Sequence, residues 1–536
     1  MTTFKLYCIL FFISFSFYLK GQDIPATFRN PILSGFNPDP SICRVNDDYY
    51  MVTSSFTWYP GIPVYHSKDL VNWEIIGHAL DRPDMIDMNG LNDNYGIWAV
   101  TIRFHNGIFY LITTANNSGG NFYLTATDPR GPWSDPVWLK DAPGIDPSLF
   151  WDDDGRCYYI GNRWDFKSEW PGQCAVWMQE LDLDRQQFVG ERKTLAYGHA
   201  NNATHAEGPH LYKINGKYLL LMAEGGAGYH HAVTVHHSDS LWGPYVADKT
   251  NPVLTHRHLG KQHPIQNPGH ADLVQTQHGD WYSVVLGVRK IKGYTPLARE
   301  TFLCKVEFEG STPIYNPGYG MLLSEQERPN LPWTPMKSEP DIDDFKNNRL
   351  APGWYNVRIP QKKIYDLENE QLALSLQPEV IDSLVHAAMM IRRIKHHTFT
   401  SMTKLNFHTK KDNEEAGLVV YRTANGYYTL MKDKYGIVLT KKYLGEKKVI
   451  QRIPYSKNEV YLKVTADSLN VNFSFGETKE QMTRIGGMQS LNAISDNTFN
   501  KFNGPGLGVY ATSNGKPSKT KAFYSWFEYE QGLPLY

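Results

Sequence analysis

Three acidic residues lie in similar local sequences at widely separated positions of the chain. Asp39 is found in Asn-Pro-Asp-Pro-Ser-Ile, Asp146 in Gly-Ile-Asp-Pro-Ser-Leu and Glu207 in Ala-Glu-Gly-Pro-His-Leu. Each acid stands next to a proline or glycine and shortly before an apolar residue, which predicts that it opens a strand. Carboxyl groups gathered in one place raise one another's proton affinity, so one can stay protonated while another remains ionised. Glycoside hydrolysis requires such a division between an acid and a base.

A fivefold repeat indicates that the three acids meet in space. A polar turn, an aromatic residue and then a second aromatic or aliphatic residue recur at 49–50, 109–110, 158–159, 218–219 and 281–282. The three acids each lie 10 to 12 residues before the first aromatic residue of their copy, and the matching positions of the other two copies hold Trp98 and His270. Asp-Pro pairs often do no more than start turns. Turn formation alone would not select corresponding positions of a repeat.

The length of the repeat indicates the fold of the N-terminal part. Successive copies are 49 to 63 residues apart, which suits four short strands per unit. Such units are typical of propeller blades, so we predict an all-β protein with a five-bladed β-propeller over 28–325. The innermost strand of each blade lines the central channel, and the repeated positions would converge there. A β-sandwich of unrelated hairpins is the alternative, although it does not explain the regular period.

A second domain is predicted after the repeats. The proline-rich segment 326–341 is typical of a linker. From 342 to 536 short runs alternate polar and apolar residues, as in Tyr-Tyr-Thr-Leu-Met at 427–431, which favours a β-sandwich of the jelly-roll type.

The N-terminus predicts export. Lys5 precedes an apolar run over 6–19, and a small residue before Gln22 suits cleavage, so residues 1–21 are predicted to be a signal peptide. The run is too short to span a bilayer, and we expect no membrane insertion of the mature chain. Cys8 lies too early to become a lipid-modified first residue. The expected location is the periplasm if the source is Gram-negative, and otherwise the protein is secreted.

Composition excludes some partners. The formal net charge is -1, so no single-sign field is present to collect phosphates, and nucleic acid is not expected as a partner. Aromatic residues make up 13% of the chain and charged residues 20%, which favours many short strands. The remaining cysteines, at 43, 157, 174 and 304, lack metal-type spacing and are expected mainly as isolated buried thiols, with one disulfide as the alternative. The sequence does not indicate an oligomeric state.

The acidic motifs resemble those of glycoside hydrolase family 43, the β-xylosidase and α-L-arabinofuranosidase group, over nearly the whole mature chain. This resemblance implies that Asp39 is the general base that activates water and Glu207 the general acid that protonates the leaving oxygen. Asp146 would adjust the pKa of its partner and orient the substrate. The family inverts the anomeric configuration, which requires room for water between base and acid. The C-terminal sandwich resembles one that often sends a loop over the pocket, which implies exo action.

The same resemblance suggests further site residues. Phe56, Trp58 and Trp98 are similar to the apolar walls of the terminal sugar subsite, where ordinary channel packing is the alternative. Arg289 resembles a substrate-contacting arginine, with a surface ion pair as its alternative. His270 resembles the histidine at which the family often holds a structural calcium ion or a water cluster, although no cofactor is expected to be required. Trp98-Ala99-Val100 departs from the Trp-Ala-Pro of many relatives, so the wall there is expected to differ.

These observations predict hydrolysis of terminal pentosyl groups from hemicellulose-derived oligosaccharides. Terminal α-L-arabinofuranosyl and β-D-xylosyl groups present similar hydroxyls, and we favour arabinofuranosidase action with β-xylosidase or bifunctional action as the close alternative. A non-catalytic glycan-binding propeller is a more distant one, since binding alone does not need three acids at matched positions. An endo-acting arabinanase would need a groove open at both ends.

Overall fold

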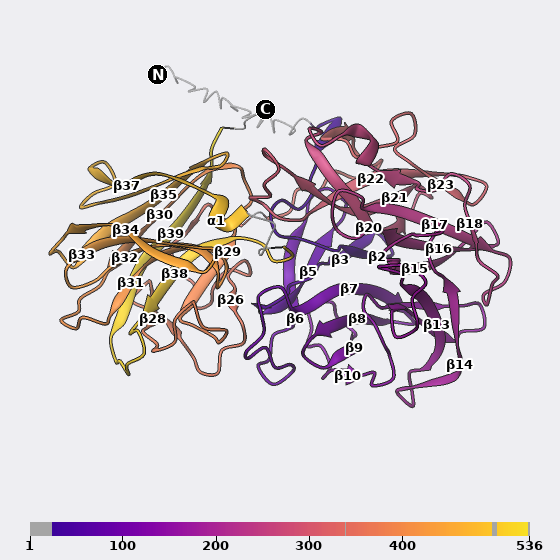
Figure 1. The fold of residues 1–536 in the computed structure, drawn as a ribbon, viewed down its shortest axis with the longest axis horizontal. Helices are drawn as coiled ribbons and strands as arrows, with labels where there is room; N and C mark the ends of the chain where they lie inside the picture. Colours follow the sequence, from indigo (N-terminus) through magenta and orange to yellow (C-terminus); the bar gives the residue numbers. More distant parts are fainter. Residues whose placement is uncertain (1–23, 338, 496–500, 534–536) are drawn as a thin grey trace, which may run out of the picture.

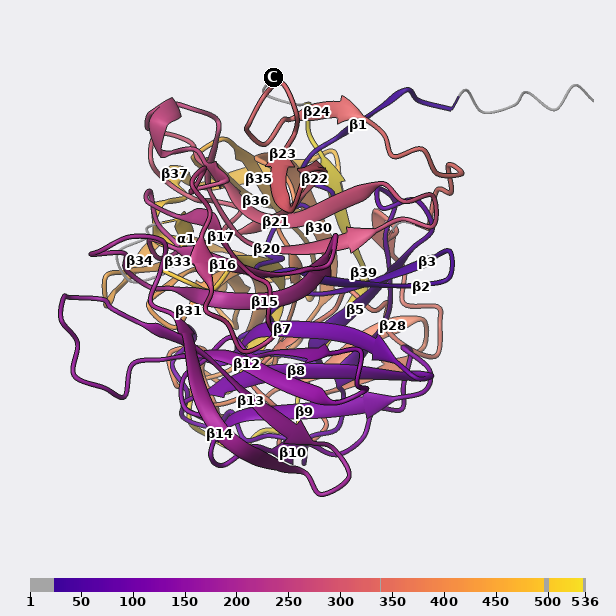
Figure 2. The same cartoon turned by 90° about the vertical axis from the view of Figure 1, so that its right-hand side faces the viewer.

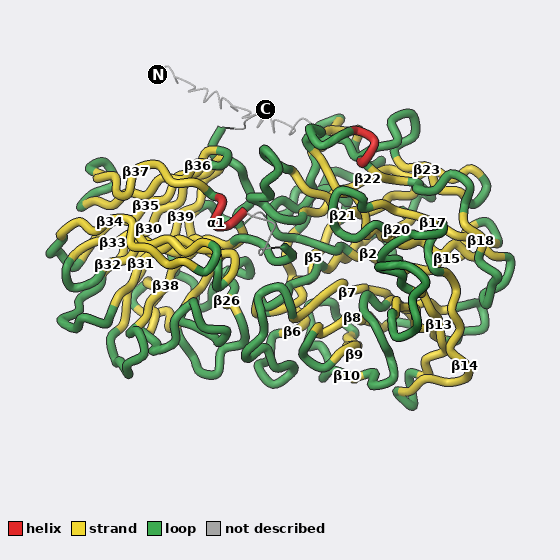
Figure 3. The backbone as a smooth tube through the Cα atoms, viewed as in Figure 1, coloured by secondary structure: helices red, strands yellow, loops and turns green. Residues whose placement is uncertain are grey.

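The computed structural model describes residues 24–337, 339–495 and 501–533, which form two β-domains packed side by side (Figure 1). Strands dominate both domains, and within the described residues helix is confined to η1 (Arg257–Leu259) and α1 (Asn492–Ser495) (Figure 3). No helix within those ranges has the length and apolar character needed to cross a membrane. The predicted all-β fold is confirmed. The predicted signal peptide, residues 1–21, lies outside the described residues.

The N-terminal domain is the predicted five-bladed propeller, and each blade pairs its strands antiparallel in chain order. Blade 1 consists of β2 (Ser41–Val45), β3 (Asp48–Val52), β5 (Gly61–Ser67) and β6 (Glu74–Leu80). Blade 2 consists of β7 (Gly96–His105), β8 (Ile108–Asn116), β9 (Gly120–Ala126) and β10 (Val137–Trp138). Blade 3 consists of β11 (Ser148–Trp151), β12 (Cys157–Arg163), β13 (Ala175–Asp182) and β14 (Gln187–Ala196). Blade 4 consists of β15 (Glu207–Ile214), β16 (Lys217–Glu224), β17 (Ala232–Ser238) and β18 (Val246–Ala247), and β19 (Leu254–Thr255) also pairs with β17. Blade 5 consists of β20 (Ile265–Gln275), β21 (Trp281–Arg289), β22 (Glu300–Glu309) and β23 (Thr312–Tyr315). In Figure 2, β7, β15 and β20 lie near the middle of the domain and β10, β14 and β23 toward its rim.

The repeated pair of aromatic or aliphatic residues begins the second strand of each blade, and it packs the blades together. Tyr158 contacts the core cluster between blades 3 and 4, whereas Tyr159 contacts the cluster between blades 2 and 3. Tyr218 and Leu219 divide in the same way between the two sides of blade 4. Successive side chains of a strand point to opposite faces, so a blade buried on both faces needs two large apolar residues in a row.

The first and last segments of the propeller chain are joined by a short sheet. β1 (Thr27–Arg29) pairs antiparallel with β24 (Glu325–Glu327), which holds the start of blade 1 beside the end of blade 5. The segment predicted as a linker, 326–341, therefore begins as a strand of the propeller. Leu331 is buried in the cluster between blades 5 and 1, and the Thr334 amide donates to Asp69 at 2.9 Å.

The C-terminal domain is a sandwich of two antiparallel sheets. One sheet is ordered β27 (Tyr365–Glu368), β28 (Gln371–Ser375), β39 (Lys521–Gln531), β30 (Thr398–Asn406), β35 (Glu459–Asp467), β36 (Asn470–Gly476), β37 (Met482–Ser490), with β25 (Ile342–Asp343) also on β39. The other is ordered β29 (Met389–Arg393), β38 (Gly506–Thr512), β31 (Glu415–Thr423), β32 (Gly426–Lys432), β33 (Gly436–Tyr443), β34 (Glu446–Pro454). A single apolar core fills the space between them.

The two domains share backbone hydrogen bonds and a buried ion pair. β26 (Asn356–Val357), from the start of the sandwich, pairs with β4 (Trp58–Tyr59) of the propeller. Asp93, on the loop before β7, accepts hydrogen bonds from Arg358 at 3.1 Å, from the Tyr421 hydroxyl at 2.9 Å and from the Ala424 amide at 2.9 Å. Asp93 and Arg358 are both buried. A buried carboxylate with one cation and two further donors is well satisfied, so it fixes the sandwich on the propeller.

Candidate active site

The five matched positions of the repeat meet in one pocket. Its volume is about 810 Å³, and its lining includes Asp39, Trp98, Asp146, Glu207 and His270. Asp39 and Asp146 each lie two residues before a strand, β2 and β11, and Glu207 opens β15. Trp98 lies near the start of β7, and His270 lies within β20. The pocket therefore lies at the end of the channel where the innermost strands begin.

The backbone at this end of the channel is strained in a repeated way. Asp39 (φ 54°), Ala99 (φ 43°), Asp146 (φ 56°) and His270 (φ 47°) all adopt the left-handed conformation. Such conformations cost about 1–3 kcal/mol each outside glycine and cluster at functional sites. The innermost strands of blades 2, 4 and 5 also carry register irregularities here. A left-handed residue or bulge redirects the side chain, so the strand starts present their polar groups to the pocket.

Asp39 is held rigidly by two donors. The Ser54 hydroxyl donates to Oδ2 at 2.7 Å and the Arg299 guanidinium to Oδ1 at 2.7 Å. Ser54 is itself fixed, because its oxygen accepts the Ala99 amide at 2.7 Å. Charge-assisted hydrogen bonds of this kind hold the carboxylate in a fixed orientation.

Asp146 is buried and Glu207 is partly buried, and among the described residues no cation is hydrogen-bonded to either carboxyl group. Burial raises the pKa of Asp146 to about 6; Asp39 acts in the same direction, while His270 and the Gly208 amide oppose it. Burial also raises the pKa of Glu207 well above its ordinary value, and repulsion from Asp146 and Asp39 adds to this. Glu207 therefore keeps its proton to higher pH than an ordinary carboxyl.

Aromatic rings from both domains form the wall of the pocket. Phe56 and Trp98 lie with ring centroids 6.0 Å apart, and Phe502 of the sandwich lies 5.7 Å from Trp98. The Arg299 guanidinium lies 5.2 Å from the Phe56 ring and 5.7 Å from the Phe502 ring. Arg299 is thereby held between two rings while it contacts Asp39.

The sandwich loop that carries Phe502 is tied to the propeller. The Asn94 side-chain oxygen accepts the amides of Phe502 and Asn503, each at 3.0 Å, and Arg299 donates to the Phe502 carbonyl at 3.2 Å. Lys501 also lines the pocket. The sandwich therefore contributes Lys501 and Phe502 to the lining of the pocket.

The amino-acid sequence matches two family models in the order of the two domains. Residues 28–313 match the model described as glycosyl hydrolases family 43, which spans more than half of the chain. The chain belongs to glycosyl hydrolase family 43. Residues 342–530 match the β-xylosidase C-terminal concanavalin A-like domain, which agrees with the two-sheet sandwich. This family 43 protein is therefore a glycoside hydrolase.

Relatives of this family 43 protein extend over nearly its whole length. It is 40% identical to a xylosidase/arabinosidase of Butyrivibrio fibrisolvens, with 94% of this chain and 99% of that one covered. It is 37% identical to a non-reducing end α-L-arabinofuranosidase of Bacteroides ovatus, with 94% of each covered. Among solved structures, a xylan β-1,4-xylosidase from Bacillus halodurans has a TM-score of 0.88 at 34% identity, with 94% of this chain and all of that chain covered.

Two of the predicted substrate-binding residues of this family 43 chain lie elsewhere. Trp58 is fully buried between the domains, against Phe36 and Tyr355, and does not line the pocket. Arg289 also lies outside the pocket lining, because its guanidinium donates two hydrogen bonds, both 2.7 Å, to the buried carboxylate of Glu300. Phe56 and Trp98 do line the pocket, and Arg299 takes the place predicted for Arg289.

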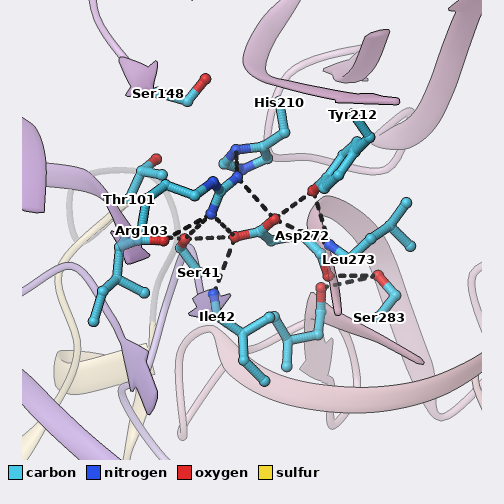
Figure 4. Close-up of polar contacts among 12 residues, drawn as sticks. Ser41, Ile42, Thr101, Arg103, Ser148, His210, Tyr212, Asp272, Leu273 and Ser283 are labelled. Atoms are coloured by element: carbon cyan, nitrogen blue, oxygen red, sulfur yellow. Dashed lines mark hydrogen bonds and ion pairs between the residues drawn. The ribbon is translucent and has the colours of Figure 1, made fainter. Parts of the chain in front are cut away.

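The carboxylate of Asp272, two residues after His270, is not available to a calcium ion in the channel of this family 43 chain. Below the pocket, Asp272 accepts from Arg103 at 2.8 and 3.1 Å, from Ser41 at 2.5 Å, from the Ile42 amide at 3.0 Å and from Tyr212 (Figure 4). Its oxygens are thus fully engaged, and a guanidinium already supplies the positive charge. Within the described ranges, no three His, Cys, Asp or Glu side chains are placed to hold a metal ion. A calcium ion would need free carboxylate or carbonyl oxygens.

His210 completes this channel network. Arg103 donates to His210 Nδ1 at 2.9 Å, so the imidazole hydrogen is on Nε2. Burial lowers the pKa of His210 to about 3, which keeps the ring neutral beside the guanidinium.

The four cysteines among the described residues are all buried free thiols, which confirms the main prediction for them.

Proposed function

We propose that this protein is an exo-acting, inverting glycoside hydrolase that releases terminal non-reducing α-L-arabinofuranosyl groups from oligosaccharides derived from plant hemicellulose. The observation that carries the proposal is the unequal setting of three carboxyl groups in one pocket. Asp39 is paired with a cation and a hydroxyl, whereas the pKa values of Asp146 and Glu207 are raised by burial. An acid and a base at one site are what hydrolysis of a glycosidic bond requires.

Each carboxyl group has one role in the proposed reaction. Glu207 gives its proton to the glycosidic oxygen as the bond to the anomeric carbon breaks. Asp39 takes a proton from a water molecule, whose oxygen attacks the opposite face of that carbon. Asp146 repels the charge that forms on Glu207, which supports the raised pKa of the acid, and it accepts a hydroxyl of the sugar. Water adds across the bond, and no covalent sugar intermediate forms.

The walls of the pocket favour a terminal sugar. Phe56, Trp98 and Phe502 offer apolar ring surfaces, and the Arg299 guanidinium beside Asp39 offers donors to hydroxyl groups. The loop with Lys501 and Phe502 covers one side of the pocket, which supports exo action over an open groove.

β-Xylosidase or combined activity is the second candidate. It is favoured by the relatives of this chain, which include a β-xylosidase of Bacillus subtilis at 33% identity as well as the arabinofuranosidase of Bacteroides ovatus. Both pentosyl groups present hydroxyls of similar position to one pocket.

Initial rates on 4-nitrophenyl α-L-arabinofuranoside and 4-nitrophenyl β-D-xyloside test the proposal, with Glu207→Ala and Asp39→Ala beside the wild type. A wild-type rate that is higher on the arabinofuranoside and lost in both variants is expected. A higher rate on the xyloside would select the second candidate. Undiminished rates in both variants would refute the assigned acid and base.

We also propose that the protein is exported, because residues 1–21 have the pattern of a signal peptide. In a Gram-negative source the periplasm is the proposed location, where short oligosaccharides would reach an exo-type pocket. Amino-terminal sequencing of the protein purified from a periplasmic fraction is expected to start at Gln22. An intact Met1 in a cytosolic fraction would contradict export.

A further inference from the structure

A second cavity lies beside the active-site pocket, and the proposed reaction makes no use of it. Its volume is about 530 Å³, and its lining includes Phe166, Trp170, Tyr197, His199, His236 and Tyr245. We call it the Tyr197 cleft. It is formed by the connection after β12, the connection after β14 and strand β17 of blade 4.

The Tyr197 cleft and the pocket lie on opposite sides of one shared wall. In the connection after β12, Trp164 and Ser168 line the pocket, whereas Phe166 and Trp170 line the cleft. Gln173 lines both. The antiparallel strands of blade 3 alternate in direction, so this connection and the one before β15 lie at the same end of the propeller as the three acids. The cleft therefore continues the surface on which the pocket opens.

The cleft presents aromatic surface to solvent. Tyr197 is 45% exposed although it is a large aromatic residue, and its ring meets Phe166 edge to face with centroids 5.8 Å apart. Trp170 is fixed, because its indole nitrogen donates to the Ala203 carbonyl at 2.6 Å. Rigid rings with an open face are suited to stacking on the apolar face of a sugar.

The floor of the cleft includes a buried, uncharged histidine. His236 is 3% exposed, and its Nε2 lies 3.3 Å from the Gly198 carbonyl, so Nε2 carries the hydrogen. Burial lowers the pKa of His236, which keeps the ring neutral. The ring therefore adds no positive charge to the floor of the cleft.

The rest of the floor is already ordered. Glu224 accepts from the His199 ring at 2.6 Å, from the His199 amide at 2.9 Å and from the Thr234 hydroxyl at 2.7 Å. The buried carboxylate thereby fixes the loop that carries Tyr197 and His199. A preformed site with rigid aromatic rings on its wall matches the apolar face of an uncharged sugar.

We infer that the Tyr197 cleft binds distal sugar units of the same oligosaccharide whose terminal unit occupies the pocket. This inference rests on the proposed function for the identity of the chain. The shared wall places the cleft where an oligosaccharide leaving the pocket over the connection after β12 would arrive. The cleft would then make the enzyme prefer longer oligosaccharides over disaccharides.

The test compares KM for substrates of increasing length in wild type, Tyr197→Ala and the control Tyr319→Ala. Tyr319 is 66% exposed and lines neither cavity. Wild-type KM is expected to fall from disaccharide to tetrasaccharide. Tyr197→Ala is expected to raise KM for the tetrasaccharide about 3- to 10-fold, as for loss of one stacked ring, with KM for the aryl pentoside within about twofold of wild type.

Each other result counts against the inference. A wild-type KM that is the same for disaccharide and tetrasaccharide, or equal effects of Tyr197→Ala and Tyr319→Ala, would overturn it. If the wild type cleaves no aryl pentoside, the proposed function fails instead. Binding of the tetrasaccharide to wild type and Tyr197→Ala, measured by calorimetry, then decides the inference: unchanged affinity overturns it and weakened affinity supports it.

Discussion

Replacing Asp146 by asparagine is expected to stabilise the fold at neutral pH while activity is lost. Burial, assisted by Asp39, raises the pKa of Asp146 from 3.8 to about 6. Because the folded-state pKa lies above the unfolded one, the ionised carboxylate costs stability that is absent at low pH and develops as the pH rises through this range. Asparagine never ionises, and its side-chain oxygen still accepts the Gly208 amide.

The size of this effect follows from the two pKa values. At about 1.4 kcal/mol per pKa unit, a carboxyl whose pKa moves from 3.8 to about 6 costs about 3 kcal/mol once the pH exceeds 6. About 1 kcal/mol of this is already present near pH 4.5, so about 2 kcal/mol develops between about pH 4.5 and 7.5. The stability advantage of Asp146→Asn over wild type should grow by that amount.

Urea unfolding of both proteins at these two pH values measures the advantage, with Asp239→Asn as the control. The Asp239 side chain is 86% exposed, so its replacement should give no such pH-dependent gain. An advantage of Asp146→Asn that is equal at both pH values, or a net loss of stability at neutral pH, would refute burial of charge as its source. The rate on the preferred pentoside should fall at least about 100-fold, because the variant loses both the charge that supports the raised pKa of Glu207 and the carboxylate proposed to orient the sugar.

Three further predictions concern the pocket and the channel. Arg299→Lys keeps the charge but loses the fork that joins Asp39 to the Phe502 carbonyl, so kcat/KM should fall about 100-fold; a rate near wild type would contradict that role. Phe502→Ala removes one ring of the wall and should raise KM for the aryl pentoside about tenfold, whereas an unchanged KM would place the sugar elsewhere. Dialysis against EDTA should leave the rate unchanged, because Asp272 is engaged by Arg103 and Tyr212; a loss that calcium restores would overturn this.

The residues that follow the repeat could be predicted from the sequence. Asp39, Asp146, Glu207, Trp98 and His270 lie 10 to 12 residues before the aromatic pair of their repeat, and a propeller brings such matching positions together at its axis. The same repeat also predicts the blades, because the two residues of each pair pack against the neighbouring blades.

The residues that lie off this period could not be predicted in the same way. Arg299 precedes β22, the third strand of blade 5, and only the fold shows that its guanidinium reaches Asp39 in blade 1. Arg289, the predicted substrate-contacting arginine, ends the neighbouring strand, but its guanidinium is hydrogen-bonded to Glu300. Phe502 depends on how the sandwich docks on Asn94, a contact between segments about 400 residues apart that no local pattern encodes. Trp58 was misplaced because β4 pairs with β26 of the other domain.

The docking of the sandwich through Asp93, Arg358 and the Asn94 contacts has a consequence for how such proteins can be rebuilt. The two domains are separate in sequence, yet the ring that closes the pocket belongs to one and the acids to the other. A shortened gene that ends at the propeller would encode a protein whose catalytic centre lacks a wall. A chimeric protein would keep an intact pocket only if the interface residues were transferred together with Phe502. The two domains therefore have to be exchanged together if the pocket is to keep all of its walls.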